Sequence, residues 1–123
     1  MNDRSKYWIE IADYDIGTAL EHAKRYAGIV CEELSPCKVV LFGSLVNGNF
    51  NENSDIDIAV VKDNLGENYW ELSKKLNRLT RNIDTRIEPI LLQADDDRSG
   101  FLTTVLTVGV ELYFVSHIAA YRG

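Results

Sequence analysis

Apolar residues recur every three or four positions through the early part of the chain, which is the spacing of an amphipathic helix. This stripe predicts a helix over residues 5–34, in which Gly17 is a point of weakness. Ser35-Pro36 ends the helix, because the residue before a proline avoids the helical region of backbone space. We expect core packing for the residues of the stripe, which are Trp8, Ala12, Ile16, Ala19, Ala23, Ala27, Val30 and Leu34.

Two short apolar runs then predict two β-strands with a polar stretch between them. Lys38–Phe42 (KVVLF) is rich in β-branched residues and is followed by a glycine. Asp55–Val61 (DIDIAVV) alternates, which places its two aspartates on one face and its two isoleucines on the other. Residues 44–54 are rich in Asn, Gly and Ser, so we expect a helical turn that passes into a loop.

A second long helix and a third strand follow. Residues 65–81 carry apolar residues at helical spacing, and residues 83–92 predict a strand in which Pro89 indicates an edge or an end. The inner face of this helix is expected to comprise Trp70, Leu72, Leu76 and Leu79. By the alternation of a strand, one face of residues 83–92 is expected to carry Asp84, Arg86 and Glu88.

The chain is predicted to close with a helix over residues 100–107 and a strand over residues 110–115. Asp95–Asp97 forms a turn that can cap this helix, and Gly109 ends it. The order of elements, α-β-β-α-β-α with a last β, predicts an α/β fold.

Composition and charge narrow the classes of function. The chain has 123 residues, 46% of them hydrophobic and 26% charged, so we expect a single domain over residues 1–123. The net charge of −6 weighs against direct binding to a nucleic acid backbone, but it permits a site that reaches phosphates through a metal ion. No apolar run approaches the about 20 residues that span a bilayer, and the N-terminus lacks an apolar signal core. We therefore expect a cytoplasmic protein without membrane contact.

The stretch that carries chemistry is Gly43-Ser44, followed ten residues later by Asp55-Ile56-Asp57. A glycine allows an unusual backbone angle and the close approach of a ligand, and a serine at a helix start suits a phosphate. Two carboxylates two residues apart on a strand point the same way and repel each other unless a cation lies between them. Paired carboxylates completed by phosphate oxygens are what Mg²⁺ prefers.

A third acid on an adjoining strand would complete a two-metal site. One metal would activate the attacking oxygen, and the other would stabilise the leaving pyrophosphate. Glu88 and Asp84 both have the alternation for this role, and we favour Glu88. If the third acid is Asp84, Glu88 would instead pair with Arg86 or with another cation.

The pattern G-S-x10-D-x-D, here Gly43, Ser44, Asp55 and Asp57, resembles the signature of the DNA polymerase beta-like nucleotidyltransferase superfamily. More narrowly, it resembles the minimal nucleotidyltransferases, and the likeness extends to the segments AKRYAG, RIEPILL and SGFL…GVELY. The resemblance implies the polymerase beta-like fold, a small mixed sheet flanked by helices. It also implies that the Gly-Ser turn holds a nucleoside triphosphate, that the Asp-x-Asp pair binds Mg²⁺, and that an acid of a later strand assists.

The resemblance also implies a partner. Minimal nucleotidyltransferases are typically encoded beside a small helical HEPN protein, a ribonuclease toxin, and act as its antitoxin. They neutralise the toxin by binding it, by transferring AMP from ATP to one of its tyrosines, or both. Residues 6–20 look somewhat like the first helix of a HEPN domain, so the N-terminal helical segment, residues 1–34, is a candidate docking helix. The chain lacks the HEPN ribonuclease motif, an Arg followed four to six residues later by His, so we do not expect it to be the toxin.

Two other functions stay open. A non-catalytic antitoxin with this fold would cover its partner with Tyr7, Trp8 and Tyr14, although such a protein would not need the repelling acids. A small-molecule transferase that acts on an aminoglycoside-like compound would need more chain to grip its acceptor. The acceptor itself, the nucleobase preference and the formation of a homo- or hetero-oligomer also stay open.

Overall fold

The computed structural model describes residues 16–114, and side chains up to Leu112, so the structural statements below concern this part of the chain. The expectations for residues 1–15 lie outside the described residues, those for Tyr7, Trp8, Ala12 and Tyr14 included. Within the described part, no helix is both long enough and apolar enough to cross a membrane.

Helix α2 (Ile16–Leu34) contains the part of the predicted apolar stripe that the structure describes. Gly17 lies within this helix, and Ile16, at 46% exposure, is the one exposed residue among the described members of the stripe. The hydroxyl of Tyr26 donates a hydrogen bond of 2.7 Å to the backbone oxygen of Leu76 on the second long helix. Burial raises the pKa of Tyr26, so the hydroxyl stays a donor and ties the two helices together.

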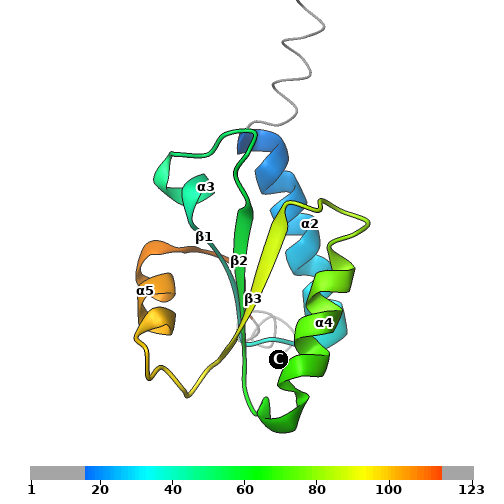
Figure 1. Cartoon of the computed structure of the whole chain (residues 1–123), viewed down its shortest axis with the longest axis vertical. Helices are drawn as coiled ribbons and strands as arrows, with labels where there is room; N and C mark the ends of the chain where they lie inside the picture. Colours follow the sequence, from blue (N-terminus) through cyan, green and yellow to red (C-terminus); the bar gives the residue numbers. More distant parts are fainter. Residues whose placement is uncertain (1–15, 115–123) are drawn as a thin grey trace, which may run out of the picture.

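Four strands form one mixed sheet in the order β3-β2-β1-β4. Figure 1 labels β1, β2 and β3 of this sheet. Strand β1 (Lys38–Phe42) is antiparallel to both β2 (Ile56–Lys62) and β4 (Val110–Phe114). Strand β3 (Ile87–Gln93) runs parallel to β2, and it is an edge strand, as Pro89 indicates. This small mixed sheet flanked by helices confirms the predicted fold class.

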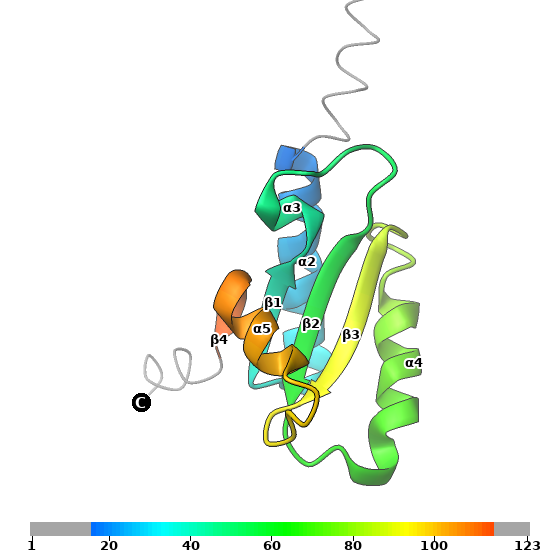
Figure 2. The ribbon, with the colours of Figure 1, turned by 60° about the vertical axis from the view of Figure 1, so that its left-hand side comes forward.

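Helices lie on both faces of the sheet (Figure 2). Helix α4 (Tyr69–Leu79), which follows a short 3-10 turn η1 (Gly66–Asn68), packs beside α2 on one face. Helix α5 (Phe101–Val108) packs on the opposite face. The strands send into the α2–α4 core Val39, Leu41, Ile56, Ile58, Val60, Ile87 and Leu91. The smaller cluster under α5 comprises Val40, Ala59 and Val105.

Two expectations for the α4–β3 region are wrong. Trp70 was expected on the inner face of its helix but is 71% exposed, and Tyr69 packs against the core in its place. Strand β3 begins only at Ile87, because residues 80–86 form hydrogen-bonded turns that break the alternation. Asp84 therefore does not share a strand face with Glu88.

The acidic turn before α5 acts as a helix cap. Asp97 accepts hydrogen bonds from the backbone N–H groups of Leu102 (2.8 Å) and Thr103 (3.0 Å), as predicted for this turn. Gly109 follows the last residue of α5, also as predicted, and a Cβ at this position would overlap Val40. The cap fixes the start of α5 on the sheet, and the close packing of Gly109 fixes its end.

Candidate active site

Strand β1 leads through Gly43 into the short helix α3 (Ser44–Asn47). Gly43 has φ 80° and ψ −150°, a backbone region that is essentially reserved for glycine. A Cβ at Gly43 would overlap Oδ2 of Asp57, so only a glycine lets this aspartate approach the turn. The backbone N–H groups of Val46 and Asn47 donate to the oxygen of Gly43, so the N–H groups of Ser44 and Leu45 are the ones that can bind an anion beside the Ser44 hydroxyl.

The pairing of the strands brings two acids together. Asp57 and Glu88 are direct partners in the parallel β2–β3 register, and Phe42 is the antiparallel partner of Asp57 on β1. Ile56 and Ile58 point into the α2–α4 core, so strand alternation directs Asp57 to the opposite face. Glu88 alternates with a buried isoleucine in the same way, so both acids share the face on which α5 packs.

Asp55 lies immediately before β2 and is exposed. Burial raises the pKa of the half-buried Asp57, and the negative charge of Asp55 raises it further. The charge of Asp55 is also the main cause that raises the pKa of Glu88, with desolvation, a hydrogen bond with Asp55 and the charge of Asp57 adding to it. The three carboxylates therefore form one coupled group with excess negative charge.

The donor set of this group fits a divalent cation that arrives with a substrate. Among the described residues, no three His, Cys, Asp or Glu side chains form a ready-made metal site. Mg²⁺ is usually held by one or two carboxylates together with water and substrate phosphates, not by a closed protein cage. Asp55, Asp57 and Glu88 supply hard oxygen ligands, and a cation between them would relieve the repulsion that raises the pKa of Asp57 and Glu88.

Asp84 belongs to a separate network behind this group. Its carboxylate accepts hydrogen bonds from the backbone N–H (2.9 Å), Nε (3.2 Å) and Nη2 (3.0 Å) of Arg86, and it lies 2.8 Å from Nδ1 of His22 on α2. Burial would raise the pKa of Asp84, but the hydrogen bonds from Arg86 and His22 lower it to about 2. The carboxylate is thus already occupied, which favours Glu88 over Asp84 as the third acid.

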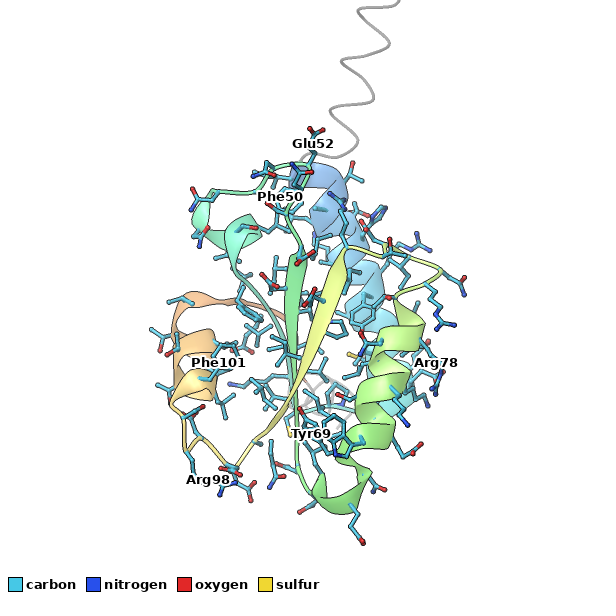
Figure 3. All side chains as sticks on the ribbon, viewed as in Figure 1. Phe50, Glu52, Tyr69, Arg78, Arg98 and Phe101 are labelled. Atoms are coloured by element: carbon cyan, nitrogen blue, oxygen red, sulfur yellow. The ribbon has the colours of Figure 1, made fainter. Side chains whose placement is uncertain are left out.

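The same network fastens the loop that carries Asp55. The guanidinium of Arg86 lies over the ring of Phe50, 5.5 Å from its centroid, and the backbone oxygen of Arg86 accepts a 2.9 Å hydrogen bond from Ile56. Figure 3 shows Phe50 at the end of the sheet where β2 and β3 begin. The sequence pattern did not single out Phe50, because a loop phenylalanine shows its role only when its partner strand is known.

Comparisons with known proteins agree with this geometry. A family model described as a nucleotidyltransferase domain matches residues 23–102, which contain the Gly-Ser turn and the three acids. A crystal structure of a candidate nucleotidyltransferase from Sulfolobus solfataricus is similar in fold, with a TM-score of 0.60 and 24% identity over 78% of this chain and 80% of that chain. A chain of a toxin–antitoxin crystallised with AMP-PNP has a TM-score of 0.53 and 25% identity, over 80% of this chain and 86% of that chain. No curated protein matches the sequence to a significant degree.

The close approach of Gly43 and Asp57 can be tested by substitution. We expect Gly43→Ala to lower the free energy of unfolding by about 3 kcal/mol, because it adds a clash with Asp57 to the strain of a positive φ. Gly48→Ala is the matched control, since Gly48 has φ 89° but an added Cβ would meet open space, and the substitution should cost only about 1 kcal/mol. Urea unfolding measures the free energy of unfolding of both variants. Equal losses would show that the clash with Asp57 does not destabilise the fold.

Substitutions of the two candidates for the third acid should differ in their effect on the free energy of unfolding. Asp84→Asn should lower the free energy of unfolding at pH 7 by about 1–3 kcal/mol, because it breaks a largely buried charge network. The pKa of Asp84 is lowered from 3.8 to about 2, so its contribution is complete above the unfolded-state value and is lost as the pH falls through the folded-state value. The difference in the free energy of unfolding between wild type and Asp84→Asn should therefore become smaller below about pH 4.

Glu88→Gln is the counterpart of this experiment. It removes a negative charge from a repelling group, so it should leave the free energy of unfolding unchanged or slightly raised at pH 7. Urea unfolding at several pH values measures both variants. A destabilised Glu88→Gln beside an unaffected Asp84→Asn would reverse the assignment of the two acids.

Proposed function

The chain belongs to the nucleotidyltransferase domain family, and we propose that it transfers AMP from ATP to a hydroxyl group with Asp55, Asp57 and Glu88 as its acids. The observation that carries this proposal is the juxtaposition of Gly43, Asp57 and Glu88. It supports a site where a phosphate-binding turn meets a group of carboxylates. The pKa of Asp57 is raised mainly by burial, and that of Glu88 mainly by the charge of Asp55. Such a pair of features suits phosphoryl transfer, because its catalysis depends mainly on positioning and on compensation of charge.

Each residue has a distinct part in this reaction. Ser44 and the N–H groups that begin α3 would hold the terminal phosphates of ATP. Asp55, Asp57 and Glu88 would hold Mg²⁺, which, when bound, compensates charge on the triphosphate and on the leaving pyrophosphate. Glu88 is exposed on the edge strand, where an acceptor hydroxyl can reach it, so it is our candidate to accept the proton of the attacking hydroxyl. The hydroxyl oxygen bonds to the α-phosphorus as the bond to the pyrophosphate oxygen breaks.

ATP is the donor that the comparisons favour. The toxin–antitoxin chain of similar fold was crystallised with AMP-PNP, an analogue of ATP with a non-hydrolysable bond. The same similarity supports a partner protein for the present chain. Together with the resemblance to the minimal nucleotidyltransferases, it leads us to propose an antitoxin whose acceptor is a tyrosine of a small helical HEPN toxin. We place this activity in the cytoplasm and in one domain that spans the chain.

The central test is the transfer of label from α-³²P-ATP to protein in the presence of Mg²⁺. Wild type should label one band, either the product of the neighbouring gene or a protein of the lysate, and chelation should abolish the label. Asp57→Asn should lose at least about 100-fold in rate, because it removes a ligand of the metal and a charge that aligns the substrate. Its free energy of unfolding should be unchanged or raised, since the substitution relieves repulsion with Asp55.

Asp95→Asn is the matched control for Asp57→Asn. Asp95 is an exposed aspartate that follows the far end of β3, so its substitution removes the same charge at a distance from the acids. This variant should label the acceptor at the wild-type rate. An absence of label together with an absence of ATP binding would contradict the proposed transfer of AMP. The alternative would then be a protein that neutralises its partner by binding alone.

The phosphate-binding turn makes a separate prediction. Ser44→Ala should weaken the binding of AMP-PNP about tenfold through the loss of one hydrogen bond to a charged group, while the affinity for AMP should stay the same. Ser73→Ala, on α4, is the control and should leave both affinities unchanged. Calorimetric titration in the presence of Mg²⁺ measures them. An equal loss for AMP and AMP-PNP would place Ser44 away from the terminal phosphates.

A further inference from the structure

Two aromatic side chains meet beside the candidate active site. Phe42 is the last residue of β1, so it directly precedes the Gly43-Ser44 turn, and it is the register partner of Asp57. Phe101 is the first residue of α5. The two rings lie edge to face, with centroids 5.9 Å apart and an interplanar angle of 81°. An aromatic surface therefore borders both the phosphate-binding turn and the acids.

Phe101 is held in place but is not buried. Its side chain is 37% exposed, while Leu102 and Val105 of the same helix are buried against the sheet. The hydrogen bonds that Asp97 accepts from Leu102 and Thr103 fix the start of α5. A large ring that is partly exposed and rigidly mounted next to a polar site offers a stacking surface at little cost in side-chain entropy.

In the proposed function, the side of the site next to β1 is available to the nucleoside. Three parts extend from the α-phosphorus of a bound nucleotide: the pyrophosphate, the incoming acceptor and the nucleoside. In the proposed function the pyrophosphate lies at the Gly43-Ser44 turn, and the acceptor approaches Glu88 on the edge strand β3. The remaining path crosses the same face of the sheet towards β1 and the start of α5, where Phe42 and Phe101 meet.

We propose that Phe101, backed by Phe42, is the surface on which the nucleobase of the donor stacks. This inference rests on the proposed function and adds the nucleobase subsite to it. Stacking on a phenyl ring uses the π-face of the base and reads no hydrogen-bond pattern. The subsite therefore selects purine over pyrimidine nucleoside triphosphates by stacking area and discriminates weakly between adenine and guanine.

Binding titrations with Mg²⁺ test the subsite with two probes, AMP-PNP and inorganic tripolyphosphate, which lacks a base. Phe101→Ala should weaken the binding of AMP-PNP about tenfold and leave tripolyphosphate binding unchanged. Phe101→Trp should restore the affinity for AMP-PNP. Leu106→Ala is the matched control, because Leu106 lies on the same helix with the same 37% exposure, and it should change neither affinity. Wild type should bind GMP-PNP about as well as AMP-PNP and UMP-PNP more weakly.

Each contrary outcome has a distinct meaning. If wild type binds neither AMP-PNP nor tripolyphosphate, the proposed function fails, and this inference fails with it. If wild type binds both and Phe101→Ala binds AMP-PNP equally well, only the nucleobase subsite is overturned. An equal loss of both probes in Phe101→Ala would give the ring a structural role and overturn the subsite. A raised KM for the acceptor with unchanged AMP-PNP affinity would assign the ring to the acceptor and overturn it as well.

Discussion

The parallel pairing of β2 with β3 is the constraint on which the candidate site depends. It sets Asp57 directly beside Glu88, although the two carboxylates repel each other. In an isolated sheet this pair of like charges would be destabilising. The opposite faces of the same strands carry Ile56, Ile58 and Ile87, which are buried under α2 and α4. Hydrophobic burial on one face thus offsets the electrostatic cost on the other, and the register that satisfies the core also brings the acids together.

The cation that precedes Glu88 in the sequence pairs with a carboxylate outside the group of Asp55, Asp57 and Glu88. The guanidinium of Arg86 lies two residues from Glu88 in sequence, yet it is paired with Asp84 and lies over Phe50. It therefore fixes the entrance to β3 and the loop before β2. Gly43 brings the start of α3 against Asp57 without adding a side chain. The result is a rigid frame with excess negative charge, which a cation that accompanies the substrate is suited to compensate.

Much of this arrangement could be predicted from the sequence, and the failures have physical reasons. Strand β1 has the predicted bounds, because a short apolar run that is followed by a glycine clearly predicts a buried strand. The choice between Asp84 and Glu88 needed the structure, because a turn before Ile87 breaks the alternation on which both predictions relied. Trp70 was misplaced because Tyr69 satisfies the same helical stripe one position earlier. The proposed nucleobase surface had no signal in the sequence, since Phe42 and Phe101 meet only in the folded chain.

The charge of the site limits how a triphosphate can bind. The four residues of α3, Ser44–Asn47, carry no cation, so this part of the site offers only N–H groups and a hydroxyl to the phosphates. The nearby acids would repel a free triphosphate, in a chain whose net charge is already −6. In the proposed function, backbone dipoles alone would not offset this repulsion, so we expect nucleotide binding to depend on a divalent cation. In the proposed site, an uncharged aromatic surface such as Phe101 would add affinity without adding charge, and the divalent cation would remain the counterion of the acids.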